Sequence, residues 1–307
     1  MSIRIGLVGC GRWGKHILRD LLSLGAEVRV TCLSEATAAE ARKAGAHDAG
    51  TTLPVSGAVD AYVVATPTAT HAVVLDGLVG TGRPIFVEKP MTADVASARR
   101  LAKAAPSTLF VMDKWRYHPA IEAMRQEAAS GAIGDVLAIR TSRWQWSNPH
   151  RDVSPLWILA PHDLSISLHI LGRIPPLRQA LTLVPGRAEL GLIAVLADEL
   201  AQVTVEIGTM SPTHRRRCLV VGTKASLELE DAYDDRILVR HGAPGDHAAT
   251  AKVIPVGTEM PLLAELRAFL AHVRGEGPPP LSAADEGVQV VTRLAEIEAE
   301  LSRVPLG

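Results

Sequence analysis

Three glycines near the beginning of the sequence have the spacing of a phosphate-binding turn. Gly9, Gly11 and Gly14 form a GxGxxG pattern directly after a short apolar run and before an amphipathic segment. Glycines in this pattern allow a tight turn, a close approach of the backbone to a pyrophosphate and close packing of a helix on a strand. The N-terminus of that helix also favours a phosphate charge. The motif predicts a dinucleotide site, to which Arg12 and Trp13 of the same turn contribute.

The choice between NAD and NADP depends on the residue that ends the second strand, about 20 residues further on. An acid there accepts a hydrogen bond from the ribose 2′-hydroxyl of NAD and repels the 2′-phosphate of NADP. Leu33 and Ser34 occupy that place, and Glu35 follows one step late. A serine hydroxyl can donate to a phosphate, and Arg12 could flank it. The pattern favours NADP, while Glu35 leaves NAD open.

A pair of opposite charges closes another predicted strand. Glu88 and Lys89 precede Pro90 at the end of an apolar run. An ammonium beside an oxidised nicotinamide and partly out of water has a lowered pKa, which suits proton transfer near neutral pH. Lys89 is therefore a candidate for the catalytic acid or base. The alternative is an ordinary surface lysine before a turn.

The apolar segment 156–172 contains two ionisable residues, His162 and Asp163, directly after Pro161. Proline is favourable in the first turn of a helix, so we expect a helix with these residues at its N-terminal end. That end stabilises Asp163 as an anion and keeps His162 neutral and able to accept a proton. A lone histidine in an apolar run is also commonly a satisfied core residue. We interpret His169, two turns further along, as structural.

Candidate substrate contacts gather in two polar and aromatic segments and at one further tryptophan. Aromatic faces with amide and guanidinium donors suit a carbohydrate ring. The alternative is that the tryptophans pack a domain junction. The candidates are Lys114, Arg116, Tyr117, His118, Trp144, Trp146, Asn148, Arg151 and Trp157.

The elements that must position these residues change in character near residue 116. Up to that point, short apolar runs alternate with segments of helical period, which predicts β-α units and a parallel sheet. Strands are predicted at 3–9, 27–33, 59–66, 83–89 and 108–113, with helices at about 13–24, 35–44, 69–80 and 92–105. Consecutive strands with short turns then indicate an antiparallel sheet, followed by two amphipathic helices. We predict an α/β protein with a doubly wound dinucleotide-binding domain over 1–116 and a second domain over 117–307.

The composition is that of an ordinary globular protein of 307 residues, with 47% hydrophobic residues and a net charge of -1. This balance gives no general attraction to nucleic acid or to a membrane. Three cysteines without CxxC spacing predict neither disulfides nor a zinc knuckle, and they fit a reducing, cytoplasmic compartment. The histidine spacing predicts no metal site. The sequence has no signal-like or membrane-spanning run, so we expect a soluble, unsecreted protein.

Five motifs occur in a characteristic order: GCGRWG at 9–14, ATPTATH at 65–71, VEKP at 87–90, RYHPAI at 116–121 and VVGTKASLELE at 220–230. With them the chain resembles the Gfo/Idh/MocA oxidoreductase family over essentially its full length. The resemblance implies a Rossmann domain followed by an α/β domain with a large open-faced antiparallel sheet. That sheet often forms the subunit interface, so a homo-dimer or homo-tetramer is expected. The family's activity is hydride exchange between NAD(P) and a carbinol carbon, usually of a sugar, sugar derivative or cyclitol.

The resemblance also implies roles for single residues. Thr66 and Pro67 would end the strand beneath the nicotinamide-side ribose, with His71 beside it. Glu88 would touch that ribose, and Lys89 would contact the reacting alcohol or carbonyl.

One departure from the family pattern concerns the mechanism. The family has a D-x-x-x-H pair on a helix of the second domain, and His162 matches its histidine. Ile158 stands where the aspartate is expected, and it can neither accept nor donate a proton. Two alternatives therefore stay open: a specialised imine or keto-sugar reductase, and a cofactor-binding protein with little turnover.

Overall fold

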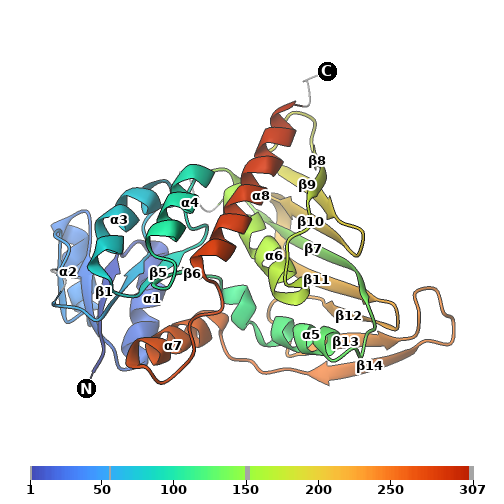
Figure 1. Ribbon diagram of the computed structural model, residues 1–307, viewed down its shortest axis with the longest axis horizontal. Helices are drawn as coiled ribbons and strands as arrows, with labels where there is room; N and C mark the ends of the chain where they lie inside the picture. Colours follow the sequence, from blue (N-terminus) through green and yellow to red (C-terminus); the bar gives the residue numbers. More distant parts are fainter. Residues whose placement is uncertain (1, 55–56, 149–152, 304–307) are drawn as a thin grey trace. The chain divides into compact units, whose positions relative to one another are not determined.

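The computed structural model divides the chain into two compact units (Figure 1). It describes residues 2–54, 57–148 and 153–303. Unit 1 comprises Met1–Lys114 and Met260–Val291, and unit 2 comprises Trp115–Glu259 and Thr292–Gly307. The division expected from sequence placed all of 117–307 in the second domain. The segment Met260–Val291 instead belongs to unit 1, because its helix α7 (Pro261–Arg274) packs on α1 (Arg12–Ser23).

Unit 1 is built on a six-stranded sheet of order β3-β2-β1-β4-β5-β6, in which every pair is parallel. Its strands are β1 (Arg4–Val8), β2 (Glu27–Thr31), β3 (Asp48–Gly50), β4 (Ala61–Val64), β5 (Ile85–Glu88) and β6 (Leu109–Met112). The strand order reverses between β1 and β4, the point at which ligands bind in such sheets. The predicted doubly wound sheet is confirmed. The sequence pattern did not indicate β3, which is too short to form an apolar run.

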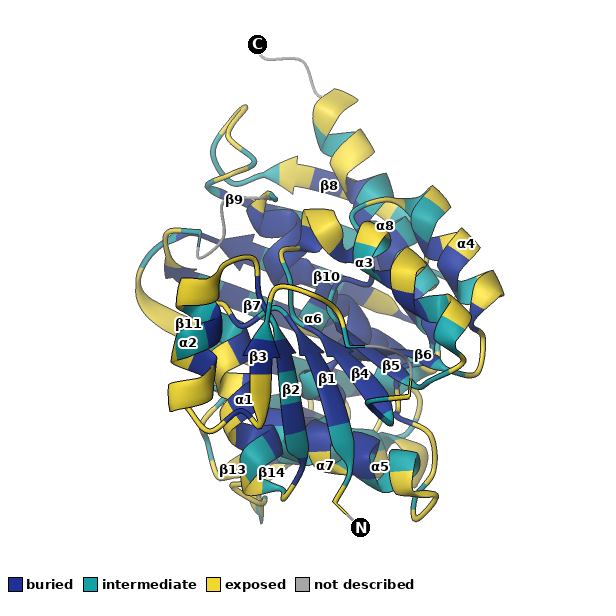
Figure 2. Cartoon of the chain, turned by 90° about the vertical axis from the view of Figure 1, so that its left-hand side faces the viewer, coloured by how far each residue is buried: buried dark blue, intermediate teal, exposed yellow. Residues whose placement is uncertain are grey.

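Helices cover both faces of this sheet, which is why its central strands are buried on both sides (Figure 2). One core joins α1, α2 (Glu35–Lys43) and α7 to one face. Figure 1 shows α3 (His71–Leu78) and α4 (Val95–Ala104) on the other side of the strands. On the α7 face, Phe269 stacks on Phe86 of β5 with ring centroids 4.8 Å apart.

Unit 2 contains an eight-stranded sheet of order β14-β13-β12-β11-β7-β10-β9-β8. Its pairs are antiparallel except β7 with β10, which is parallel. The predicted, mainly antiparallel sheet is confirmed. Its strands are β7 (Val136–Trp146), β8 (Leu177–Thr182), β9 (Gly191–Ala197), β10 (Gln202–Gly208), β11 (Met210–Gly222), β12 (Ala225–Leu229), β13 (Arg236–His241) and β14 (Thr250–Pro255).

Two helices pack on one face of this sheet. The helix α5 (Pro119–Ala129) contacts β12 and β13, and α6 (Pro155–Leu171) contacts β7, β9 and β10. The final helix, α8 (Ala284–Arg303), runs through the end of unit 1 into unit 2. The opposite face of the sheet carries exposed and half-exposed side chains. None of the helices in the described ranges combines the length and the apolar character that crossing a bilayer requires.

The helix α6 corrects one prediction. It begins at Pro155, after Ser154 as the N-cap, and Pro161 lies inside it. Pro155 already occupies the first-turn position that favours proline, and the long apolar surface of α6 holds the helix together despite the amide proton that Pro161 lacks. His162 and Asp163 are therefore not at the N-terminal end. The helix dipole does not set their charge states as expected.

Candidate functional site

The glycine turn of unit 1 has the shape that a dinucleotide needs. Gly9 has φ +94, and a Cβ there would lie 2.6 Å from the Ala65 carbonyl oxygen. A Cβ on Gly14 would lie 2.4 Å from the Gly9 carbonyl oxygen. By contrast, no described atom lies within 4 Å of the corresponding point on Gly11, the N-cap of α1. The turn thus packs tightly on its protein side and is open where a pyrophosphate would meet the helix N-terminus.

The turn after β4 adds a second indication of a ligand. The Thr66 hydroxyl oxygen is buried and has no hydrogen-bond partner among the described residues. Its neighbour Pro67 is exposed. A buried hydroxyl without a partner is costly, so a bound molecule that pairs with it would be stabilised. These residues fit a dinucleotide that crosses the carboxyl ends of β1 and β4.

His71 is placed differently from the expectation that it lies beside the ribose. It is 1% exposed, and its two ring nitrogens lie 2.9 Å from the carbonyl oxygens of Thr66 and Pro90. The imidazole thereby connects the turn after β4 to the turn that carries Lys89. We correct its role from cofactor contact to positioning residue.

A cluster of charged and aromatic side chains surrounds the end of β5. The Trp13 indole donates to one oxygen of Glu88, and the Lys89 amide donates to the other at 3.2 Å. The Lys114 ammonium lies 4.4 Å from the Trp13 ring centroid. Burial raises the pKa of Glu88, and the positive charge of Lys89 opposes that shift. Trp13, Glu88 and Lys89 are thus brought together, and Lys114 belongs to this cluster in unit 1.

The end of β2 presents no acid toward the ribose position. Leu33 is 100% exposed, and the Ser34 hydroxyl accepts from the Thr37 amide at 3.3 Å as the cap of α2. The Glu35 carboxylate lies 3.4 Å from the Arg42 guanidinium on the same helix. Arg12 is exposed at the first position of α1.

In unit 2, Asp163 forms a buried ion pair that the sequence did not predict. The Arg143 Nε atom donates to both carboxylate oxygens at 2.8 Å, and the side chains are 3% and 1% exposed. Burial raises the pKa of Asp163, while the neighbouring guanidinium opposes that shift. Because its oxygens are engaged and out of solvent, Asp163 holds Arg143 in place. We correct its predicted catalytic role to a positioning role.

An aromatic layer connects this ion pair to His162. The Arg143 guanidinium carbon lies 4.1 Å from the Trp115 ring centroid, a cation-π geometry. Trp115 stacks on His118 at 4.9 Å, and its centroid lies 6.4 Å from that of His162. His162 is half-buried as a residue, and the Nδ1 atom of its imidazole is buried. Such a surface can stack a sugar ring and exchange a proton with a hydroxyl.

Two predicted substrate contacts, Trp144 and Trp146, lie on the sheet face opposite Arg143 and stay predictions. Along β7, Arg143 and Gln145 are buried on the α6 side, so Trp144 and Trp146 point to the opposite face. Trp144 packs over Gly208 of the neighbouring strand, and Trp146 is 68% exposed. The structure does not bring these indoles together with His162. In "SRWQW", alternate residues point to the same face of the strand. This alternation would have predicted Arg143 as an inward-pointing residue if the sequence had shown which face is buried.

Arg116 is occupied within unit 2 rather than exposed to a substrate. It is buried, and its Nε donates to His169 Nδ1 at 3.3 Å. The other ring nitrogen of His169 lies 2.9 Å from a Glu122 oxygen. Burial and the Arg116 charge lower the pKa of His169 to about 4, while hydrogen bonds from Arg125 and its neighbours lower that of Glu122 to about 2.

The remaining candidates are mostly structural. The Trp157 indole donates to Glu298 at 2.9 Å and is buried, so it anchors α6 to α8. His118 caps α5, and Asn148 donates to the Val153 carbonyl at 3.1 Å. Tyr117 is half-exposed and stays a predicted substrate contact. Arg151 lies outside the described residues.

Among the described residues, no group of three or more His, Cys, Asp or Glu side chains could hold a metal ion. The residues that were predicted from sequence and remain candidates form two groups, one in each unit. Unit 1 holds the glycine turn with Glu88 and Lys89, and unit 2 holds His162 beside Trp115 and the Arg143–Asp163 pair.

Comparison with known proteins agrees with this geometry. Residues 3–111 match the model of the Gfo/Idh/MocA group, described as an oxidoreductase family with an NAD-binding Rossmann fold. An inositol 2-dehydrogenase of Rhizobium meliloti (strain 1021) is 29% identical over 262 residues, which cover 81% of this chain and 76% of that protein.

Two further similarities extend over almost the whole chain. The dTDP-3,4-didehydro-2,6-dideoxy-alpha-D-glucose 3-reductase of Streptomyces violaceoruber is 25% identical over 309 residues, 90% of this chain and 86% of that protein. A solved structure of levoglucosan dehydrogenase in complex with NADH superimposes with a TM-score of 0.86 at 17% identity, covering 100% of each chain. At that identity the likeness shows the shared fold.

Proposed function

Because the chain belongs to the Gfo/Idh/MocA oxidoreductase family, we propose that it transfers a hydride between a nicotinamide dinucleotide and a carbinol or carbonyl carbon of a sugar, sugar derivative or cyclitol. The observation that carries this proposal is the glycine turn, tight on its protein side and open at Gly11. The relatives that act on a cyclitol and on a keto-sugar supply the substrate class.

The cofactor would be held by Gly9, Gly11 and Gly14 at its pyrophosphate, with Thr66 and Glu88 toward its nicotinamide half. When bound, it supplies or accepts the hydride. Of the three predicted catalytic residues, Asp163 is engaged in its ion pair with Arg143. Either Lys89 or His162 would therefore transfer the proton at the substrate hydroxyl. Lys89 is half-buried, and its backbone amide donates to Glu88 at 3.2 Å.

We assign NADP as the preferred cofactor. Leu33 is fully exposed where an acid would repel the 2′-phosphate, and the Glu35 carboxylate is held toward Arg42. The structural relative with NADH favours the opposite choice. The ratio of kcat/KM for NADPH and NADH decides between them, and Leu33→Asp is expected to move it toward NADH.

A second candidate function is reduction of a pathway keto-sugar or an imine, with protonation chemistry that does not need the family aspartate. Ile158 favours it, because this 5%-exposed apolar residue lies one helical turn before His162. Ile158→Asp should then leave turnover unimproved. A clearly higher turnover of ordinary polyols by Ile158→Asp would contradict this hypothesis and favour the common family mechanism.

The proposed function is tested by cofactor binding and turnover. Titration of the purified protein with NADP and NAD, followed by calorimetry, should show binding of at least one of them. A screen of sugars, keto-sugars and cyclitols that follows nicotinamide absorbance should then find turnover, and Lys89→Ala should abolish it. Absence of cofactor binding would end the proposal, whereas binding without turnover on any substrate would favour a cofactor-binding protein.

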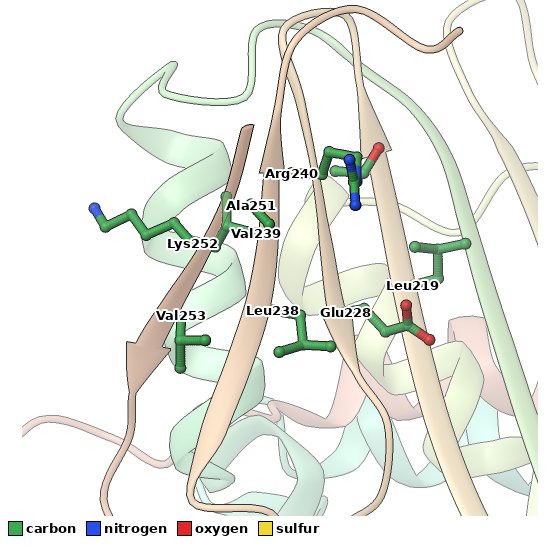
Figure 3. A pocket seen from close by; sticks show the side chains of 9 residues that line it. Leu219, Glu228, Leu238, Val239, Arg240, Ala251, Lys252 and Val253 are labelled. Carbon is green, nitrogen blue, oxygen red and sulfur yellow. The ribbon is translucent and has the colours of Figure 1, made fainter. Parts of the chain in front are cut away.

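We also propose a homo-dimer or homo-tetramer formed through the open face of the sheet in unit 2. That face includes a hollow of about 410 Å³ across β11 to β14 (Figure 3). It is lined by Leu219, Ser226, Glu228, Leu238, Val239, Arg240, Ala251, Lys252 and Val253. Light scattering should give a mass of two or four chains, and Leu238→Glu should lower it. Val73→Glu, at an exposed apolar residue of α3, is the matched control.

A cytoplasmic location is proposed from the thiols. Cys10, Cys32 and Cys218 are all free and buried, which suits a reducing compartment.

A further inference from the structure

The helix α7 presents a carboxyl group that the proposed mechanism does not use. Glu265 is 1% exposed, and its Oε2 atom is buried without a hydrogen-bond partner among the described residues. It lies one helical turn before Phe269, so both side chains are on the same face of α7. A buried carboxyl group without donors is costly when it is ionised.

The register of α7 on the sheet identifies what Glu265 faces. Phe269 stacks on Phe86 of β5. Glu88 follows Phe86 by two residues and so points to the same side of the strand. One turn of helix and two residues of strand both advance the chain by about 6 Å. Of the two directions along β5, the one toward Glu88 is selected by the charge of Glu88, which acts on Glu265 more strongly than any other charged group, so Glu265 lies near Glu88 at the carboxyl end of the strand.

The surroundings make the two carboxyl groups unequal. Glu88 accepts hydrogen bonds from the Trp13 indole and the Lys89 amide, and such donors favour its ionised form. No described residue donates to Glu265 Oε2. Burial, and then the negative charge of Glu88, raise the pKa of Glu265 well above its ordinary value. Lys114 opposes this shift and Asp113 reinforces it, so the charged groups around Glu265 come from β5 and from the end of β6.

We propose that Glu265 carries a proton beside ionised Glu88, and that this proton is released to solvent when an oxidised nicotinamide cofactor binds. The inference rests on the proposed function. In a Rossmann sheet the adenosine half lies over β2, so the nicotinamide half lies on the side of β4 and β5. The oxidised ring is positively charged and the reduced ring is neutral. A positive charge near the pair allows both carboxylates to be ionised, so the O–H bond of Glu265 breaks and buffer takes the proton.

Proton counting by calorimetry tests the proposal. The wild-type protein is titrated with oxidised and with reduced cofactor, each in two buffers of different ionisation enthalpy at the same near-neutral pH. The difference between the buffers gives the number of protons exchanged on binding. We expect more protons released with the oxidised form. Glu265→Gln should remove most of the difference in proton release between the two cofactor forms. Lys89 is the expected source of any proton release that is left, and Lys89→Met should remove that part.

A matched control comes from the other end of α7. Glu276→Gln, at an exposed glutamate just beyond the helix, should release the same number of protons as the wild type. The inference is overturned if Glu265→Gln keeps the wild-type difference, or if the wild type shows none. In those cases the proposed function stands, because both cofactor forms still bind. If neither form binds, the proposed function and this inference fall together.

A spectroscopic measurement on the wild type covers the case in which Glu265→Gln does not fold. Infrared difference spectra with isotopically labelled glutamate should show the loss of a protonated carboxyl band on addition of the oxidised cofactor. The band should persist with the reduced cofactor. An unchanged carboxyl spectrum with both forms would contradict the proposal.

Discussion

Each unit of the molecule holds a pair of ionisable side chains with at least one buried member, and the two pairs are opposite in kind. In unit 2, Asp163 meets Arg143, so the buried charges have opposite signs and their hydrogen bonds are made. In unit 1, the negative charge of Glu88 acts on buried Glu265, whose Oε2 atom has no hydrogen-bond donor among the described residues. The first pair is stable in one protonation state. The second must hold a proton, and is therefore sensitive to pH and to added charge.

This difference matches the expected tasks of the two units. The Arg143–Asp163 pair supports the Trp115 layer beside His162, where a fixed surface is needed. The Glu88–Glu265 pair lies at the sheet edge where a cofactor changes its charge during the reaction. A positioning pair gains from satisfied hydrogen bonds, whereas a responsive pair needs two states of similar free energy.

The largest expected effect comes from breaking the satisfied pair. Asp163→Ala leaves the Arg143 guanidinium buried without its partner and should lower the free energy of unfolding by about 3–5 kcal/mol. Denaturant unfolding measures it. The double variant Arg143→Met/Asp163→Leu removes both charges and should recover most of the loss. A double variant as unstable as the single one would show that the pair is not the cause.

The His169–Glu122 contact gives an intermediate case in unit 2. The pKa of His169 falls from 6.5 to about 4 on folding, so the folded state favours neutral imidazole. Its contribution to stability is present above pH 6.5 and is lost as the pH falls toward about 4, at most about 3 kcal/mol. Thermal unfolding against pH measures this loss, and His169→Gln should flatten it. The Glu122 contribution disappears only below pH 4.5, which separates the two groups.

The glutamate pair should show the opposite dependence on pH. The pKa of Glu265 is raised above 4.5 on folding, so the folded state binds the extra proton and stability falls as the pH rises beyond that value. One proton corresponds to about 1.4 kcal/mol per pH unit. Glu265→Gln should be flatter than the wild type and comparatively more stable at alkaline pH. A parallel pH profile for the two proteins would mean that Glu265 is ionised in the fold.

The smallest effect is expected from the exposed tryptophan of β7. Trp146 points away from the face that carries Arg143 and Asp163, so Trp146→Ala removes no contact on that face and should change kcat/KM by less than about twofold. Trp115→Leu, within the layer beside His162, should raise KM clearly. Steady-state kinetics on the substrate found by the screen measure both. A large decrease in kcat/KM for Trp146→Ala, with Trp115→Leu unaffected, would support the prediction from sequence that Trp146 contacts the substrate.

The sequence by itself determined the features that depend on local spacing. The GxGxxG turn, the alternating β-α units and the charged end of β5 are set by neighbours in the chain, so their elements could be predicted from periodicity and turn chemistry. The preference of proline for the first turn of a helix misplaced the start of α6, because both Pro155 and Pro161 fit that preference. Only the packing of the whole helix selects Pro155.

Only the tertiary structure decided which side chains share a site. The phase of β7, not its composition, buries Arg143 and exposes Trp146, and a shift of one residue would exchange them. The charge of Glu88 acts on Glu265 because Phe269 of α7 stacks on Phe86 of β5, and these two phenylalanines are far apart in the sequence. Burial and long-range charge then set the protonation of each group. These quantities depend on distances in space, which residue spacing alone does not contain.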